Sequence, residues 1–269
     1  MNYFWKHTKC IESVISRAGR VLLLLDFDGT LAPIVSTPNR AKLPKNTKEI
    51  LEKLLHNQNI CLGVVSGRAL SDVINKVGIN GLIYSGNHGM EWEINRKVYK
   101  TYLPLEIIKI LKDAKEELEQ IKSRFPGILV EDKGLSLALH YRIVPDNERS
   151  MVVRLLDERL AKYLTTKQVS LIKGNYTYDL RANCGRTKGD LASELKRKLC
   201  SGDDVIIYVG DSTTDEDVFN KLTAGITIKV GKPTGSNAKY YLKDSRDVCN
   251  FLFWVSKLSR KHFWISGKV

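Results

Sequence analysis

Residues 21–31 read VLLLLDFDGTL, and this stretch places two carboxylates directly after an apolar run. The five apolar residues 21–25 are long enough for one buried strand. If the chain stays extended beyond that strand, its two-residue period points Asp26 and Asp28 the same way. Carboxylates so close repel each other unless a cation or a proton lies between them. The motif therefore predicts a divalent metal, with one aspartate as nucleophile and the other as proton carrier.

The composition is typical of a folded chain of one or two domains. Its 269 residues are 43% hydrophobic and 27% charged. The five cysteines are scattered and include no CxxC pair, which argues against a disulfide framework or a zinc ribbon and favours a reducing cytoplasm. No stretch approaches the roughly 18 apolar residues of a membrane span, and no apolar export signal opens the chain. We therefore expect a cytoplasmic protein that does not span a membrane.

The formal net charge of +13 raises nucleic-acid binding as an alternative, because clustered lysine and arginine neutralise phosphates. The basic residues are spread along the chain among acidic ones, which favours a solvated surface that attracts a small anionic substrate. The tail KLSRKHFWISGKV at 257–269 is the one locally basic and aromatic segment. It fits a membrane or protein contact, or equally a helix end followed by a frayed terminus. We expect no nucleic-acid partner, and a monomer.

Strands and helices alternate in the first and last parts of the chain, a pattern typical of a doubly wound parallel α/β sheet. Ligands of such sheets bind outside the carboxyl ends of the strands, where Asp26, Ser66 and Asp211 lie in this sequence. Asn46 or Thr47 is expected to cap the first helix of this region. The expected strands are 21–25, 60–67, 82–85, 205–210 and 225–230, and the expected helices are 46–57, 69–77, 216–222 and one beginning near Lys188.

Residues 104–180 follow a different order of elements, αββαββ. Helices are expected at 105–123 and 147–163, each followed by two strand-like segments. Such a segment forms its own sheet with helices on one face. We therefore predict a Rossmann-like core made of residues 1–103 and 181–269, interrupted by an inserted α/β domain at 104–180.

Four landmarks in order resemble the haloacid-dehalogenase (HAD)-like phosphatase superfamily: DFDGTL at 26–31, Ser66 closing a strand, Lys188 opening a helix, and GDSTTD at 210–215. The resemblance implies that the inserted domain is a cap of the C2B type. It also implies that Asp26 attacks the phosphoryl group to form an aspartyl-phosphate. Asp28 would then protonate the leaving oxygen and later deprotonate the water.

The same resemblance implies the remaining roles at the catalytic centre. Mg²⁺ would be held by the Asp26 carboxylate, the Asp28 main-chain carbonyl and Asp211. Ser66 and the amide of Gly67 would bind phosphate oxygens, and Lys188 would offset charge on the phosphate and the nucleophile. Asp215 would support this arrangement or orient Lys188 without binding the metal directly.

Further motifs resemble the trehalose-6-phosphate phosphatase family: SGR at 66–68, GNHGMEW at 86–92, EDKGLSLALHYR at 131–142 and GDSTTDEDVF at 210–219. The resemblance implies a sugar-contacting set made of Arg68, Asn87, His88, Glu131, Lys133 and Asp179. Hydroxyl-rich sugars suit such donors and acceptors. Two alternatives stay open, a cross-strand salt bridge between Glu131 and Lys133 and a purely turn-capping His88.

Two departures from the family pattern concern the metal and the sugar. Ser212 stands where a second aspartate is usual, and Asp179 stands where glutamate is usual. These departures concern the exact sugar and not the chemistry. The resemblance implies trehalose 6-phosphate as the substrate, with sucrose 6-phosphate, glucosylglycerol phosphate and mannosylglycerate phosphate as alternatives. A non-catalytic regulatory subunit is a further alternative, which the intact acidic motifs disfavour. A trehalose-6-phosphate synthase is the candidate protein partner.

Overall fold

The computed structural model describes residues 1–261, with side chains to Leu258, and this part of the chain forms two compact units. The core unit contains Met1–Ile34, Ala41–Tyr99 and the chain from Arg186 onward, and the insert unit contains Val35–Arg40 and Lys100–Gly185. The predicted domain limits at 103/104 and 180/181 lie within five residues of the limits between these units. Residues 35–40 differ, because they group with the insert unit and not with the predicted core.

The core unit is built on a nine-stranded sheet with the order β1-β13-β12-β11-β2-β3-β4-β5-β6. Neighbouring strands from β1 to β4 in this order pair in parallel, and β5 pairs antiparallel with β4. This confirms the predicted parallel α/β fold. The strands are β1 (Asn2–Tyr3), β2 (Val21–Leu25), β3 (Ile60–Val65), β4 (Ile83–Gly86), β5 (Glu91–Ile94), β6 (Lys97–Lys100), β11 (Val205–Gly210), β12 (Ile226–Val230) and β13 (Tyr240–Leu242).

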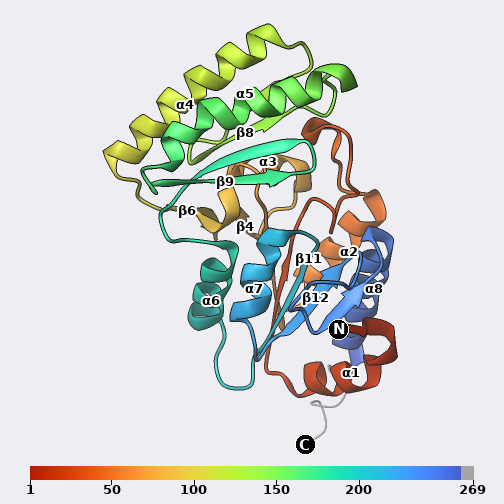
Figure 1. Ribbon diagram of the computed structural model, residues 1–269. Coiled ribbons are helices and arrows are strands. Elements are labelled where there is room, and N and C mark those ends of the chain that lie inside the picture. The colour runs from red at the N-terminus through yellow and green to blue at the C-terminus, as the bar shows by residue number, and fades with distance from the viewer. Residues whose placement is uncertain (262–269) are drawn as a thin grey trace, which may run out of the picture. The chain divides into compact units, whose positions relative to one another are not determined.

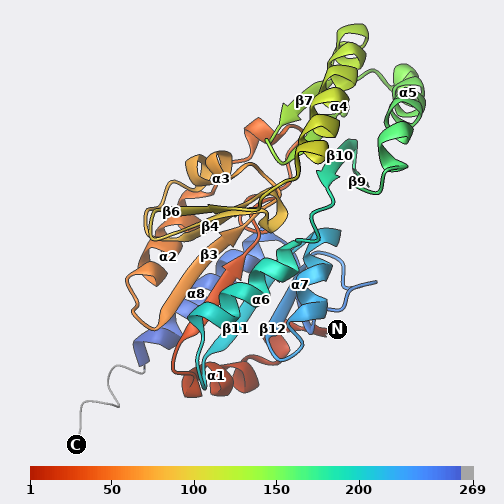
Figure 2. The same ribbon diagram turned by 90° about the vertical axis from the view of Figure 1, so that its left-hand side faces the viewer.

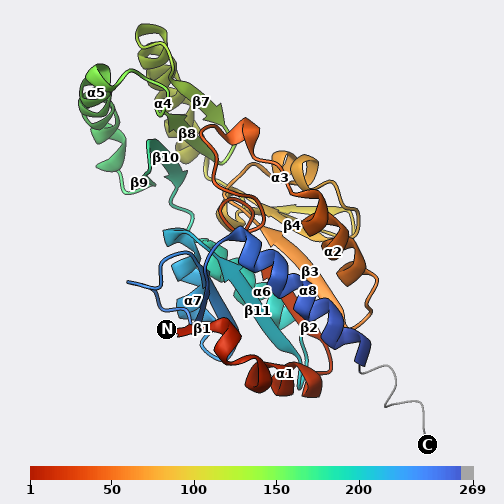
Figure 3. The ribbon, with the colours of Figure 1, turned by 90° about the vertical axis from the view of Figure 1, so that its right-hand side faces the viewer.

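Helices cover both faces of this sheet, with α6 and α7 on one face and α2 and α8 on the other (Figures 2 and 3). Leu22 and Leu24 of β2 pack with Tyr208 of β11 and Leu191 of α6 in one buried cluster. The helices are α1 (Thr8–Arg17), α2 (Lys45–Leu55), α3 (Leu70–Val77), α6 (Lys188–Leu199), α7 (Glu216–Lys221) and α8 (Ser245–Lys261), with short 3₁₀ turns η1 (Phe4–Lys6), η3 (Asn87–Gly89) and η4 (Thr213–Asp215).

Strand β2 lies at the centre of the sheet, hydrogen-bonded to β3 on one side and β11 on the other. All five of its side chains are buried, as expected for a strand covered on both faces. The Asp26 amide continues the ladder by donating to the Val209 carbonyl at 2.9 Å. The apolar run therefore brings Asp26 to the carboxyl edge of the sheet, beside the end of β11.

The insert unit follows the predicted order of elements, with the helix α4 and two strands followed by α5 and two strands. Its sheet has the order β7-β8-β10-β9 with every pairing antiparallel, and α4 and α5 lie on one face (Figure 1). The elements are α4 (Leu105–Arg124), β7 (Leu129–Asp132), β8 (Ser136–His140), α5 (Asp146–Leu164), β9 (Val169–Gly174) and β10 (Thr177–Ala182), and the turn η2 (Pro38–Arg40) groups with this unit.

Two local features differ from the sequence expectations. The N-cap of α2 is Pro44, without a side-chain hydrogen bond, so the predicted caps Asn46 and Thr47 are wrong. An additional hairpin joins β5 to β6 through Asn95 and Arg96, which have φ angles of 51° and 63°. Two consecutive positive φ values are typical of the tight type I′ hairpin turn. Within residues 1–261, no helix is both long and apolar enough to cross a membrane.

Candidate active site

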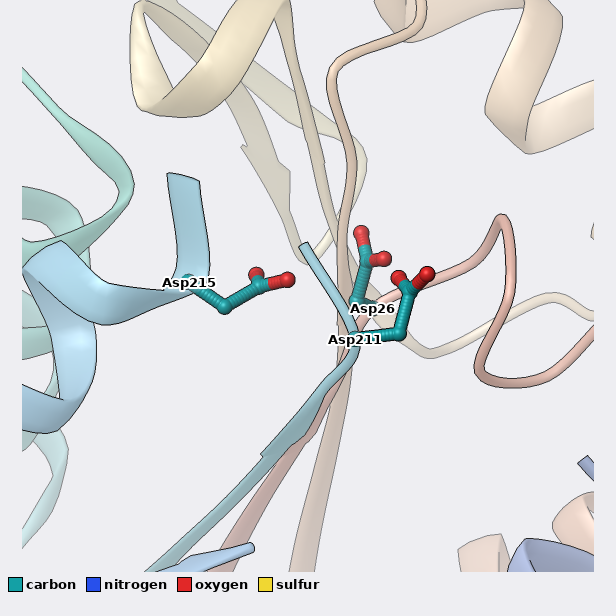
Figure 4. Close-up of side chains that lie close together, drawn as sticks. All are labelled: Asp26, Asp211 and Asp215. Carbon is teal, nitrogen blue, oxygen red and sulfur yellow. The ribbon is translucent and has the colours of Figure 1, made fainter. Parts of the chain in front are cut away.

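Three carboxylates converge at the carboxyl edge of the core sheet (Figure 4). Asp26 follows β2, Asp211 follows the neighbouring strand β11, and Asp215 ends the turn η4. Each offers an oxygen within 4.8 Å of the others. Parallel strand ends meet at one edge of a sheet, which explains how residues 185 positions apart come together.

Lys188 places a buried ammonium group between two of these carboxylates. Its Nζ donates to Asp26 Oδ1 at 2.7 Å and to Asp215 Oδ1 at 2.8 Å. Lys188 is the first residue of α6, whose start is fixed by a capping box between Thr187 and Asp190. The cap therefore positions the lysine as well as the helix.

Asp215 accepts four hydrogen bonds, which occupy both of its oxygens. Oδ1 accepts from Lys188 and from Tyr208 Oη at 2.6 Å. Oδ2 accepts from the Ser212 amide at 2.8 Å and the Ser212 hydroxyl at 2.6 Å. Asp215 thus anchors Lys188 and the turn, and the residue that departs from the family pattern, Ser212, closes that turn.

Asp211 has the opposite character, because its Oδ1 is buried and has no hydrogen-bond partner among the residues that the structure describes. Burial and the charge of Asp215 raise its pKa to about 6. Burial also raises the pKa of Asp26 well above its usual range, although Lys188 acts against that rise. An unpartnered carboxylate oxygen beside a second buried carboxylate fits a hard divalent cation, which takes oxygen ligands.

Asp28 is not a member of this group of three carboxylates. Strand β2 ends at Leu25, and the chain turns over residues 27–32, where the Gly29 amide donates to the Ala32 carbonyl at 2.8 Å. The Asp28 carboxylate accepts two hydrogen bonds from Arg68, from Nε at 2.6 Å and from Nη2 at 2.7 Å.

Ser66 and Gly67 form the turn that follows β3. Ser66 is fully buried, and its hydroxyl accepts from the Arg68 amide at 3.2 Å. A Cβ at Gly67 would lie 2.2 Å from Cε1 of His88, so only glycine lets the imidazole pack there. The His88 amide donates to the Ser66 carbonyl at 3.0 Å, which joins the two loops.

The loop of η3 holds Asn87 and His88 in left-handed conformations, with φ angles of 47° and 57°. The Asn87 amide group donates to Glu91 Oε1 at 2.8 Å, so β5 supports the loop. Left-handed backbone at two consecutive residues other than glycine costs free energy and is found most often at functional sites.

In the insert unit, Glu131 of β7 and Asp179 of β10 both pair in register with Ala138 of β8. The three residues therefore share one face of the sheet. The opposite face meets the helices, because Tyr178, next to Asp179, donates to Asp157 of α5 at 2.8 Å. The predicted carboxylates thus lie on the face away from α4 and α5.

Partners on the same face hold these two carboxylates. His140 Nε2 lies 3.4 Å from Glu131 Oε2, and Arg181 Nη2 donates to Asp179 Oδ2 at 2.7 Å. Lys133 lies in the turn after β7, where its amide donates to the Ser136 carbonyl at 3.0 Å. The predicted residues Glu131 and Asp179 are therefore neighbours across a single strand.

Sequence reasoning did not single out two residues that support the three carboxylates at the carboxyl edge of the core sheet. Tyr208 is fully buried and holds Asp215, and Lys229 of β12 donates to the Asp211 main-chain carbonyl. The sequence did contain a sign of Tyr208, because tyrosine is the one side chain with a polar tip in the apolar strand VIIYVG. The sequence contained no such sign of Lys229, since a lysine near a strand end is common.

The chain is similar in sequence to known trehalose-phosphate phosphatases. Trehalose-phosphate phosphatase B of Arabidopsis thaliana is 29% identical over 91% of this chain and 69% of its own length. The trehalose-phosphate phosphatase of Mycobacterium tuberculosis is 36% identical to this chain over the matched region. That region makes up 74% of this chain and only 50% of the M. tuberculosis protein.

Solved structures share the fold. The C-terminal domain of the C. albicans trehalose-6-phosphate phosphatase has a TM-score of 0.81 at 20% identity, over 93% of this chain and 96% of that one. The C-terminal domain of the Candida albicans trehalose synthase regulatory protein has a TM-score of 0.68 at 12% identity, over 91% and 97% of the two chains. The family model for trehalose-phosphatase matches residues 24–246, so the chain belongs to the trehalose-phosphatase family.

Proposed function

We propose that this protein is a Mg²⁺-dependent phosphatase that hydrolyses trehalose 6-phosphate to trehalose and phosphate through an aspartyl-phosphate on Asp26. The observation that carries the proposal is the buried Lys188, which joins Asp26 to Asp215 beside the unpartnered oxygen of Asp211. A structural ion pair would need only one carboxylate per lysine. Here one ammonium contacts two carboxylates, and the third carboxylate, Asp211, adds a negative charge that a cation would offset.

Asp26 and Asp211, with the main-chain carbonyl of Asp28, are the proposed holders of Mg²⁺. When bound, the ion would neutralise charge on the phosphate oxygens and on the two carboxylates. Asp215 is not assigned to the metal, since its oxygens already accept four hydrogen bonds.

The reaction proceeds in two displacements. An Asp26 oxygen forms a bond to phosphorus while the bond to the sugar oxygen breaks, and Asp28 gives that oxygen a proton. Asp28 then takes a proton from water, whose oxygen attacks phosphorus and releases Asp26. Lys188 keeps Asp26 in place in both steps, and Ser66 with the Gly67 amide binds the equatorial phosphate oxygens.

Sugar recognition is assigned to Glu131, Lys133 and Asp179 of the insert unit, acting as a cap, and to Asn87 and His88 of the core. The support is the shared sheet face of Glu131 and Asp179, which presents two carboxylates as acceptors for sugar hydroxyls. The names of the relatives add weight to trehalose 6-phosphate over other glycosyl phosphates.

One observation keeps a second candidate in view. A protein titled as a trehalose synthase regulatory protein has the same fold, so the fold alone does not establish catalysis. The intact set of Asp26, Lys188 and Asp211 favours an enzyme, because a protein that only binds has no need to bury costly charges.

The test is phosphate release from trehalose 6-phosphate and from sucrose 6-phosphate, glucosylglycerol phosphate and mannosylglycerate phosphate, with and without Mg²⁺. We expect the highest kcat/KM for trehalose 6-phosphate and no turnover after chelation. Asp26→Asn should abolish turnover, and wild-type rates in that variant would rule out the aspartyl-phosphate. Preference for another ester would change the substrate and leave the chemistry intact.

We further propose that the protein acts as a monomer in the cytoplasm and can work beside a trehalose-6-phosphate synthase that supplies its substrate. All five cysteines are free thiols, which suits a reducing compartment. Light scattering of the purified protein and copurification with the synthase are the direct tests.

A further inference from the structure

Arg68 is a buried arginine in the turn after β3, and it binds two carboxylates at once. Its side chain is only 7% exposed. Nε and Nη2 donate to the two oxygens of Asp28 at 2.6 and 2.7 Å, and Nη1 donates to Asp72 Oδ2 at 2.7 Å. The guanidinium carbon also lies 5.5 Å from the centre of the Phe27 ring.

These contacts determine where the Asp28 carboxylate lies. Asp28 is on a turn, its side chain is 46% exposed, and without a partner it could rotate freely. A bidentate arginine binds a carboxylate in one plane and one direction, which a single hydrogen bond does not do. Arg68 is itself held by the ring of Phe27 and by Asp72 in the first turn of α3.

We propose that Arg68 is a positioning residue for Asp28, and that Asp72 acts in the reaction only by orienting Arg68. The inference rests on the proposed function, in which Asp28 carries the proton in both displacements. It assigns Arg68 a role in the rate of the chemical steps, whereas the sequence placed it among the sugar-contacting residues.

The two roles predict different kinetics. A residue that positions the proton carrier changes kcat, since the substrate binds as before but the proton is misplaced. A residue that only contacts the sugar raises KM and has no effect on p-nitrophenyl phosphate, which has no sugar. Asp72 offers an independent probe, because Arg68 links its carboxylate to that of Asp28.

The experiment measures kcat and KM for trehalose 6-phosphate and p-nitrophenyl phosphate in the full chain with Mg²⁺. We expect Arg68→Ala to lower kcat for both substrates by about 100-fold, the loss typical of a misplaced catalytic group, with little change in KM. Arg68→Lys should not restore the rate, because an ammonium cannot hold both oxygens. Asp72→Asn should lower kcat less, and Arg68→Ala with Asp72→Asn should be no slower than Arg68→Ala alone.

Controls separate folding and the proposed function from this inference. Arg20→Ala removes another arginine–aspartate pair of the core unit, with Asp204, and should leave kcat unchanged. Thermal melting of each variant reports folding. A raised KM for trehalose 6-phosphate with unchanged kcat and unchanged p-nitrophenyl phosphate turnover would overturn the inference, as would additive effects of Arg68 and Asp72. Asp28→Asn with wild-type kcat would instead overturn the proposed function of Asp28.

Discussion

At the residue scale, Lys188 joins two of the three carboxylates at the carboxyl edge of the core sheet. Its side chain is 2% exposed, and its ammonium contacts Asp26 and Asp215, whose side chains are 5% and 0% exposed. Removing one partner of such a buried group leaves the opposite charges uncompensated and costs about 3–5 kcal/mol. We therefore expect Lys188→Met to abolish turnover and to lower the free energy of unfolding by about 3 kcal/mol near neutral pH.

Urea denaturation followed by circular dichroism measures that loss. The matched control is Lys198→Met on the same helix, since Lys198 is half exposed and pairs with Glu194 at 2.6 Å. A surface pair of this kind contributes at most about 1 kcal/mol. Equal losses in both variants would mean that the buried contacts of Lys188 add nothing to stability.

The hydrogen bond of Tyr208 leads to a second prediction, which concerns stability. Its hydroxyl donates to Asp215, and hydrogen bonds to charged groups contribute about 1.5–3 kcal/mol, compared with about 1 kcal/mol for neutral ones. Tyr84 offers a neutral counterpart, since its hydroxyl is also buried and donates to the Ile79 carbonyl at 2.6 Å. Tyr208→Phe should therefore destabilise the protein more than Tyr84→Phe in urea denaturation. A larger loss of stability in Tyr84→Phe than in Tyr208→Phe would mean that the Tyr208 hydroxyl does not stabilise Asp215.

At the scale of elements, the start of α6 couples helix stability to the position of Lys188. The Thr187 hydroxyl accepts from the Asp190 amide, and the Asp190 carboxylate accepts from the Thr187 amide. Thr187→Ala should cost about 1 kcal/mol, the usual effect of losing an N-cap. It should also lower kcat, because Lys188 is the next residue.

Thermal melting and steady-state kinetics check both effects. Thr187→Ser keeps the hydroxyl and should behave like the wild type in both measurements. If Thr187→Ala lowers stability and leaves kcat unchanged, the lysine is positioned by its carboxylate partners and not by the cap.

The elements show where sequence reasoning succeeds and where it stops. Apolar runs such as 21–25 and 205–210 predicted central strands correctly, because a strand buried on both faces must be apolar throughout. The β5–β6 hairpin was missed because its turn, Asn95-Arg96, lacks the glycine that usually marks a type I′ turn. The cap of α2 was misplaced because Pro44 starts that helix without a side-chain hydrogen bond.

The candidate site, too, could be predicted from the sequence only in part. Motif spacing brought Asp26, Lys188 and Asp211 to one edge of the sheet, since the carboxyl ends of parallel strands meet there. The partner of Asp28 could not be predicted, because Arg68 reaches it across two loops whose shapes depend on Gly29 and Gly67. The side chain of Asp211 packs closely on Gly29 and that of His88 on Gly67, and such packing leaves little trace in a single sequence.

At the scale of the whole molecule, the carboxylate cluster makes stability depend on pH and on divalent cations together. The folded metal-free protein holds protons on Asp26 and Asp211 more tightly than the unfolded chain does, since burial raises both pKa values. Their contribution to stability is therefore fully present below the unfolded pKa of about 3.9 and is lost as pH rises through the folded values, about 6 for Asp211. The pKa of Asp215 is lowered, so its contribution has the opposite sign and is lost on acidification.

Mg²⁺ should reverse the loss at higher pH, because it binds carboxylates only after their protons leave. We expect added Mg²⁺ to raise the melting temperature more at pH 7.5 than at pH 5.5, with a gain near saturation of about 2.7 kcal/mol at 100 times Kd. Differential scanning calorimetry at both pH values, with Mg²⁺ or with chelator, measures the effect. Asp211→Asn should remove most of the difference, whereas Asp203→Asn, at an exposed position of the same unit, should preserve it. A Mg²⁺ effect of equal size at both pH values, or one that survives in Asp211→Asn, would place the ion away from the carboxylate cluster.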